Sequence, residues 1–194
     1  VIANFSRMDK SKLKVKLKSF FPNLDEESLH AFMKHSSYVK STKGTKLISE
    51  GKRHGYFYLI LNGGVKSYYS KESREVCMWF AFENEAIGTM TTYEGLPSKE
   101  TVELLEGSEL IRFEIEKIKE LSRTSLSVIH LLNDIVIEHT LCIEERLYQL
   151  QFMSSEERYN ALFETTPEIL QRVSLTDIAS FLGISRETLS RIRS

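Results

Sequence analysis

The segment from Leu175 to Arg193 constrains the fold more than any other part of the chain, because its apolar residues have the spacing of two short helices. Ile178 and Leu182 lie one turn apart and would share a face of the first helix. Gly183 follows directly, where a tight turn between two helices favours a positive φ. The second helix would turn its own apolar residues toward the first, and these are Leu189 and Ile192.

The second of these helices would carry polar residues on its outer side. Ser185 is placed to cap the start of the helix. The outward positions are Arg186, Glu187, Thr188 and Arg191. Arginine can donate two hydrogen bonds to guanine, and a carboxylate can accept one from cytosine, so this face suits the major groove of DNA. An ordinary helical hairpin is the alternative, but the glycine and the Ser-Arg-Glu-Thr start favour a helix-turn-helix that reads DNA.

Composition is ordinary for a globular protein, and the local charge is more informative than the total. The chain has 194 residues, of which 41% are hydrophobic and 27% charged, with a formal net charge of -1. This length has room for one large domain and a small one. From residue 171 to the end, however, four arginines stand against Asp177 and Glu187. A local basic patch of this kind is enough to attract DNA.

The cysteines and the hydropathy pattern indicate a compartment. Cys77 and Cys142 form no Cys-x-x-Cys pair, so a reducing cytoplasm is expected, without an iron–sulfur cluster, which needs about four thiolates. The histidines are scattered without ligand spacing, so no metal is expected. No run approaches the roughly 20 apolar residues that span a bilayer, and no secretory leader is visible. The sequence therefore predicts no membrane partner.

Residues 1 to about 38 are predicted to be helical. The stretch 25–33 has helical spacing and an acidic first turn. The alternating lysines over 12–18 would by themselves favour a strand. They could also form a second nucleic-acid patch, but a solvated face is the preferred interpretation of so short a basic run.

From about Tyr38 to Glu116 the sequence changes to short aromatic and β-branched runs between turn signals. The predicted strands are Lys46–Ile48, Tyr56–Leu61, Val65–Tyr69, Glu75–Phe82, Thr101–Leu105 and Glu109–Ile115. Because most are joined without a segment of helix length, an antiparallel sandwich or barrel is expected rather than alternating strands and helices.

Residues from about 118 to 152 are predicted to form one long helix with two apolar stripes. The first stripe is Ile129, Leu132, Val136, His139, Ile143, Leu147 and Leu150, and the second is Val128, Leu131, Ile135 and Cys142. One stripe can rest on the β-domain and the other on a twin helix from a second subunit. Burial of both stripes within one chain is the alternative. His139 is interpreted as an interface residue rather than a sensor.

The segment Gly183–Ile192 closely resembles the recognition segment of the CRP/FNR transcription regulators of bacteria, and the order of predicted elements along the chain resembles that family too. The resemblance implies a jelly-roll sensor, a dimerisation helix and a helix-turn-helix, acting as a homodimer on palindromic double-stranded DNA with RNA polymerase as a partner. It implies base contacts from Arg186, Glu187 and Arg191, and a phosphate contact from Ser185. The remaining DNA-binding candidates are Ser174, Thr176 and Thr188.

The ligand motif of that family is broken in this chain. Related β-domains hold a cyclic nucleotide with a Gly-Glu step, whose acid takes the ribose, and with an arginine about eleven residues after the glycine, which takes the phosphate. Here Gly88 is followed by Thr89, and Lys99 stands near the arginine's position. Lysine cannot reproduce the two-pronged contact of arginine. The candidate pocket residues are therefore Gly88, Thr89, Met90, Lys99 and Glu100, and the effector is either another small molecule or absent because side chains fill the pocket.

The sequence thus predicts an α+β protein with three parts: a sensor over 1–117, a dimerisation helix over 118–152 and a DNA-binding domain over 153–194. Family members commonly continue into a β-hairpin wing; here the wing is either naturally absent or truncated. The rival hypothesis is a ligand-binding or protein-interaction module of the same fold that does not act on DNA. An enzyme is less favoured, because no nucleophile–base pair, metal cluster or phosphate loop is discernible.

Overall fold

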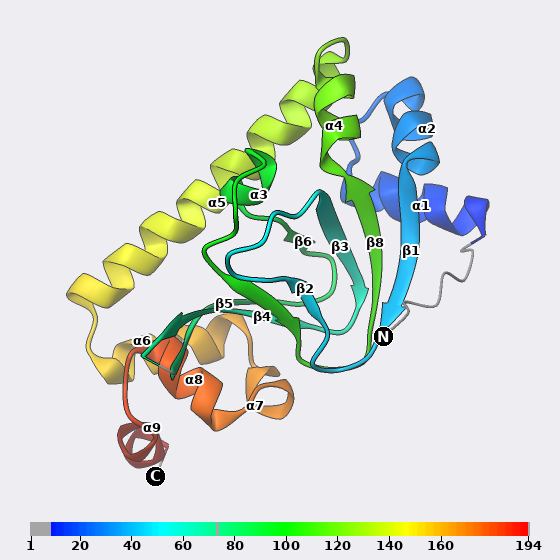
Figure 1. Cartoon of the computed structure of the whole chain (residues 1–194). Coiled ribbons are helices and arrows are strands. Elements are labelled where there is room, and N and C mark those ends of the chain that lie inside the picture. The colour runs from blue at the N-terminus through cyan, green and yellow to red at the C-terminus, as the bar shows by residue number, and fades with distance from the viewer. Residues whose placement is uncertain (1–8, 73, 194) are drawn as a thin grey trace.

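Two antiparallel sheets face each other and form the centre of the computed structural model, which describes residues 9–72 and 74–193 (Figure 1). Within those residues each sheet has four strands, in the orders β1-β8-β3-β6 and β2-β7-β4-β5. The strands are β1 Ser36–Ser41, β2 Lys46–Ile48, β3 Tyr56–Asn62, β4 Val65–Lys71, β5 Arg74–Ala81, β6 Ala86–Ile87, β7 Thr101–Leu104 and β8 Ser108–Glu114. This pairing of two sheets is that of a jelly roll.

The six strands expected from the sequence are all present, to within a few residues at their ends. Sequence reasoning missed β1, whose six residues are mostly polar, and β6, which has only two residues. The core between the sheets contains fully buried side chains from facing strands, including Ile60, Val65 and Leu110. Alternation of buried and exposed positions along strands such as β8 is what made them recognisable.

The N-terminal segment forms two helices, α1 Lys10–Phe20 and α2 Glu26–Lys34. The lysine-rich stretch is therefore a helix, although its period of two favours a strand. Asp9 caps α1, and the helix buries Leu17 while its lysines stay exposed, so the tertiary contact of one apolar side overrides the local pattern. The first eight residues of the predicted helical region lie outside the described residues.

The long helix predicted over 118–152 is divided into two, α4 Ile115–Ser122 and α5 Leu126–Phe152. The break falls at residues 123–125, where Ser125 accepts a hydrogen bond from the amide of Val128 (3.3 Å) and caps α5. A short helix α3, Met90–Tyr93, also interrupts the β-domain and was not anticipated. Lys119 of α4 lies over the ring of Tyr93, at 4.9 Å from its centroid, and joins the two helices.

The C-terminal part consists of helices that pack on the end of the second sheet. They are α6 Ser155–Thr165, α7 Ile169–Arg172, α8 Leu175–Leu182 and α9 Arg186–Ile192. Helix α8 lies against β5, and α9 lies farthest from the sheets (Figure 1). Phe82 and Leu105 of the β-domain share one apolar cluster with Ile169, Val173 and Leu182, so the two parts of the chain have a common core.

Close packing of two turns at the end of the sheets offers a test of the fold. Gly63 has φ 100°, and a Cβ there would lie 2.1 Å from the Oγ of Ser108. Gly44 has φ 80° but open space around it. Gly44→Ala should therefore lower the free energy of unfolding by about 1–2 kcal/mol, from backbone strain alone. Gly63→Ala should lower it by about 1–3 kcal/mol more, because the added Cβ would overlap Ser108. Equal losses in denaturant unfolding would contradict the packing.

Candidate functional site

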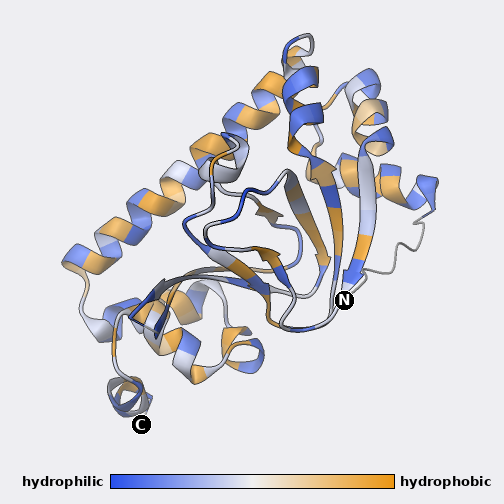
Figure 2. Cartoon of the chain, viewed as in Figure 1, coloured by the Kyte–Doolittle hydropathy of each residue, from blue (hydrophilic) through white to orange (hydrophobic). Residues whose placement is uncertain are grey.

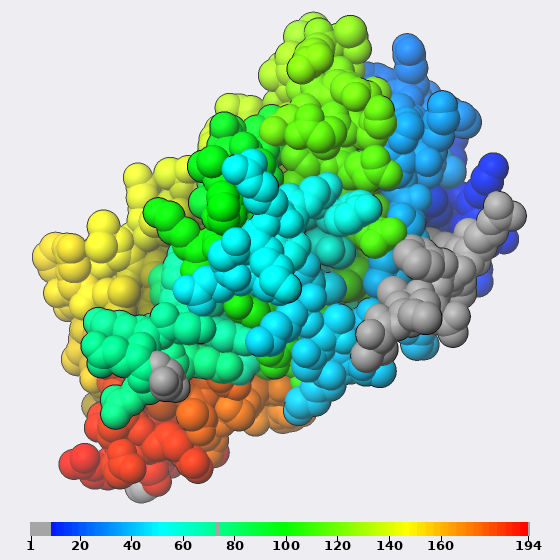
Figure 3. All heavy atoms as spheres, viewed as in Figure 1, coloured from blue at the N-terminus to red at the C-terminus, as the bar shows by residue number. Residues whose placement is uncertain are grey.

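The polar face of α9 is accessible to solvent. Arg186, Glu187 and Arg191 are exposed, and Thr188 is half-buried. The amide of Thr188 donates to the Oγ of Ser185 (3.1 Å), so the expected cap is present. Hydrogen bonds from its own amide and from Ser185 hold the pKa of Glu187 below its usual value. The face therefore offers guanidinium donors beside an ionised carboxylate, at one end of the molecule (Figure 3, red).

The turn before α9 fixes its direction. Gly183 ends α8 with φ 70°, in the left-handed region that the sequence predicts for it. The amide of Ile184 donates back to the carbonyl of Ala179 (3.0 Å), which closes the end of α8. Leu189 of α9 is 1% exposed and packs into the cluster that contains Ala179 and Leu182. Helix α9 is thus anchored by one apolar side, which leaves its polar side free to face outward.

The start of α8 lies beside this face. Ser174 and Thr176 are exposed, and Ser174 caps α8 by accepting from the amide of Asp177 (3.1 Å). A hollow of about 330 Å³ separates the start of α8 from α9. It is lined by Leu175, Arg186, Leu189, Ser190 and Arg193. Of the residues predicted to contact DNA, Arg186 alone lines this hollow, and Arg193 adds a second cationic side chain to its wall.

Along α5 the two apolar stripes meet different surroundings. Residues of the second stripe face the β-domain, where Val128 is buried. The first stripe is divided: Ile129 and Val136 are 43% and 44% exposed, and Leu132 is half-buried. Its other members, His139, Ile143, Leu147 and Leu150, line a groove between α5 and the β-domain. Figure 2 shows hydrophobic and hydrophilic residues alternating along the whole of α5. A further exposed apolar set, not anticipated from the sequence, comprises Leu126, Ile137, Leu141, Tyr148 and Phe152.

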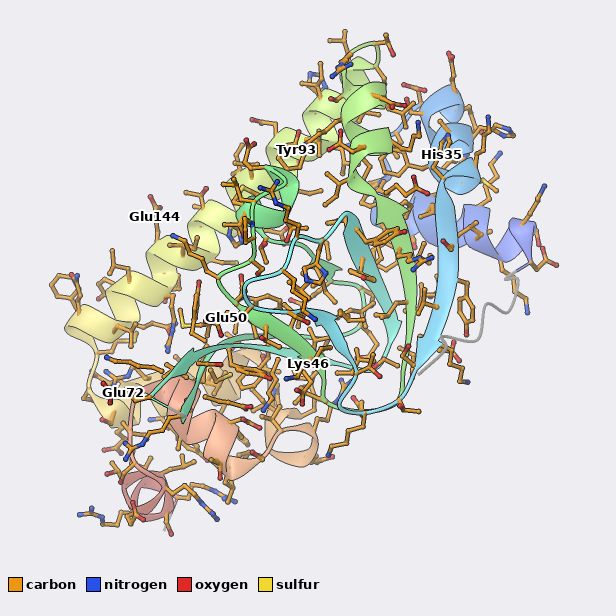
Figure 4. All side chains as sticks on the ribbon, in the orientation of Figure 1. His35, Lys46, Glu50, Glu72, Tyr93 and Glu144 are labelled. Atoms are coloured by element: carbon orange, nitrogen blue, oxygen red, sulfur yellow. The ribbon has the colours of Figure 1, made fainter. Side chains whose placement is uncertain are left out.

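In length and composition α5 could cross a membrane, with a mean hydropathy of 1.4 over its most apolar window. A single helix of this kind is weak evidence for a membrane span. Its charged and polar residues also continue along the whole helix, as Glu144 shows on the side directed away from the sheets (Figure 4).

The candidate pocket residues have separate roles in the structure. Thr89 is buried and caps α3, accepting from the amide of Thr92 (3.0 Å). Lys99 is exposed. Glu100 accepts from the indole N–H of Trp79 (3.0 Å) and from the hydroxyl of Ser67. The Thr89 hydroxyl is used to cap a helix, and the Glu100 carboxylate is already held by two donors. Neither resembles the acid and arginine pair that holds a cyclic nucleotide.

A groove of about 680 Å³ lies between α5 and the β-domain, and only Gly88 and Met90 of the five pocket residues line it. Most of its lining is apolar, including Trp79 and Phe80. Its polar members are Asn23, Asn84, Glu85, Ser127, Asp134, Glu138, His139 and Arg146. Burial raises the pKa of Glu85, and nearby Glu138 adds to the effect. Sequence reasoning missed this groove, because its walls come from segments far apart in the chain.

Comparison with known families identifies the β-domain. Residues 38–125 match the family model of the cyclic nucleotide-binding domain. No curated protein matches the chain.

Solved structures of similar fold include several regulators. FixK2 from Bradyrhizobium japonicum has a TM-score of 0.72 and 18% identity, over 81% of this chain and 82% of that one. CLP, the c-di-GMP responsive global regulator of Xanthomonas campestris, has a TM-score of 0.66 and 20% identity, over 87% and 89%. The catabolite activator protein of Thermus thermophilus has a TM-score of 0.56 and 20% identity, over 90% and 84%. At these identities the likeness is one of fold: a cyclic nucleotide-binding domain followed by a long helix.

Proposed function

We propose that the chain is a transcription regulator that binds double-stranded DNA as a homodimer, with α9 in the major groove and the β-domain as sensor. The observation that carries the proposal is the exposed Arg186, Glu187 and Arg191 face on a helix that Ser185 caps and Leu189 anchors. Arginine suits guanine and an ionised carboxylate suits cytosine. The regulators of similar fold support the same conclusion.

The dimer would form through α5. Ile129 and Val136 of its first stripe, together with Ile137 and Leu141, are large apolar side chains that a single chain leaves exposed. A twin helix would bury them, as two-stranded packing of apolar stripes does elsewhere. Paired α5 helices would relate two α9 helices by a two-fold axis, about 34 Å apart, and the operator would be palindromic. RNA polymerase would be the further partner, and the cytoplasm the compartment.

The sensor would not respond to cyclic AMP in the usual way. Thr89 and Lys99 stand where an acid and an arginine are expected, and Glu100 places a further carboxylate beside them. One neighbour is named as c-di-GMP responsive, so the fold is compatible with other effectors. A different small molecule, or none, is therefore proposed, and no catalytic activity is expected.

The rival function is a ligand-binding or protein-interaction module that does not act on DNA. The groove of about 680 Å³ beside α5 is the observation in its favour. Binding of duplex DNA that weakens steeply as salt rises would separate the two, because only a protein that neutralises phosphates releases counterions.

Base specificity should reside in the arginines of α9. Arg191→Ala should cost about 1–3 kcal/mol per half-site and relax one base preference, whereas Ser185→Ala should weaken all sequences alike. Selection of bound sequences from random DNA measures the base preference, and titration of the selected sequences measures the affinity of each variant. Arg123→Ala, an exposed arginine beyond the end of α4, is the control and should bind as the wild type. Equal, sequence-independent losses for Arg191→Ala and Ser185→Ala would contradict the assignment.

Charges placed on the first stripe of α5 should separate the subunits. Val136→Glu and Ile129→Glu each put a carboxylate where the twin helix would bury it, so sedimentation should find a dimer for the wild type and a monomer for the variants at micromolar concentration. His130→Glu changes an exposed residue on another side of α5 and should remain dimeric. A wild-type chain that stays monomeric, even with DNA, would refute this interface.

Cyclic AMP should not bind tightly. A cyclic phosphate buried without a guanidinium fork is poorly compensated for the water it loses, and Glu100 would repel it. Titration calorimetry with cyclic AMP and cyclic GMP is the direct measurement. Dissociation constants in the low micromolar range, abolished by Lys99→Ala, would show that lysine can replace the arginine.

A further inference from the structure

Arg172, at the end of α7, makes the most extensive polar contact between the C-terminal helices and the β-domain among the described residues. Its Nη1 and Nη2 donate to the two carboxylate oxygens of Glu83, at 2.8 and 2.9 Å. Its Nε donates to Glu106 (2.9 Å), and its guanidinium lies over the ring of Phe82, 4.4 Å from the centroid. The Arg172 side chain is only 19% exposed. Such a two-pronged, partly buried contact is both stronger and more directional than a surface ion pair.

The two carboxylates come from opposite ends of one segment of the β-domain. Glu83 lies in the turn after β5, and Glu106 lies in the turn after β7. Between them the chain passes through Gly88–Glu100, the segment that contains the candidate pocket residues named from the sequence. Glu83 also accepts from the amide of Gly63 (2.7 Å), so the turn after β3 joins the same cluster. The Arg172 guanidinium therefore links α7 to three turns of the β-domain, two directly and the third through Glu83.

A second contact holds α8 to the same sheet. Lys66 of β4 pairs with Asp177 of α8 (3.0 Å), and both side chains are less than 20% exposed. The amide of Cys77 in β5 donates to the Oγ of Ser180 (2.9 Å). These bonds lie along α8 on the side that meets β4 and β5. The orientation of α8, and with it that of α9, is thus defined relative to the β-domain of the same chain.

We propose that Arg172 is a positioning residue: through Glu83 and Glu106 it sets the orientation of the DNA-reading helices directly from the sensor domain, within one chain. A displacement of the segment Gly88–Glu100 would move one carboxylate relative to the other and so shift α7 and α8. This route is separate from α5, which reaches α8 through Arg146 and the carbonyl of Phe181. The inference rests on the proposed function, because it concerns how the DNA-binding face is held.

The test compares charge reversal with its restoration in the full chain. Arg172→Glu should place three carboxylates together and release α7 and α8 from the sheet. Amide hydrogen exchange over 169–182 should then rise at least tenfold, and affinity for the selected operator should fall at least tenfold. The triple variant Arg172→Glu, Glu83→Arg and Glu106→Arg restores opposite charges at the same positions and should recover both quantities to within about threefold of the wild type.

Two further variants complete the experiment. Arg172→Lys keeps the charge but loses the fork, so it should fold and give intermediate exchange and affinity. Glu168→Gln changes an exposed residue next to α7 that makes no cap hydrogen bond, and it should behave as the wild type. If exchange over 169–182 is unchanged in Arg172→Glu and Arg172→Lys, or if it rises without loss of DNA affinity, the positioning role is refuted.

Failure of the proposed function would be visible separately. A wild-type chain that binds no DNA would refute DNA reading, while the exchange comparison between Arg172→Glu and the triple variant would still decide whether this contact holds α7 and α8 on the sensor.

Discussion

The packing of α8 against the end of the second sheet determines where the polar face of α9 points. Helix α8 is held on one side by Lys66 and the amide of Cys77. On another side, Arg158 of α6 donates to the carbonyl of Leu182 (3.0 Å), and Arg146 of α5 donates to the carbonyl of Phe181. Cationic side chains at the end of a helix are favoured by its dipole and satisfy its last carbonyls. The short helices at the C-terminus are therefore stabilised by polar contacts with the rest of the chain as well as by the apolar cluster that they share with Phe82 and Leu105.

Local patterns in the sequence were sufficient for most elements, because each depends on residues close together. Leu182, Gly183 and Ser185 mark an apolar face, a left-handed turn and a cap, and all three take those positions. The strands were visible for the same reason. Helix α1 lies in the region predicted to be helical, although the period of two in its lysines favours a strand. The break before Ser125 was missed, because a single cap can interrupt a continuous apolar pattern.

The candidate sites were predictable only in part. The exposed residues of α9 follow from helical periodicity, so their common face could be derived from spacing alone. The contact of Arg172 with Glu83 and Glu106 joins residues that are 89 and 66 positions apart, and no local signal connects them. Thr89 illustrates a different limit: its identity shows that an acid is missing, but only the fold shows that its hydroxyl caps α3. Ion pairs between residues far apart in the sequence, and the hydrogen bond that each polar atom makes, depend on how the strands and helices are arranged in space.

The exposed apolar side chains of α5 also affect how the stability of this chain would be measured. Ile129, Val136 and Ile137 are each more than two-fifths exposed in a single chain, so folding alone leaves apolar area in water. If a second copy covers that area, association and folding are linked by mass action. The midpoint of thermal unfolding then rises with protein concentration, and dilution alone shifts the chain toward its unfolded state.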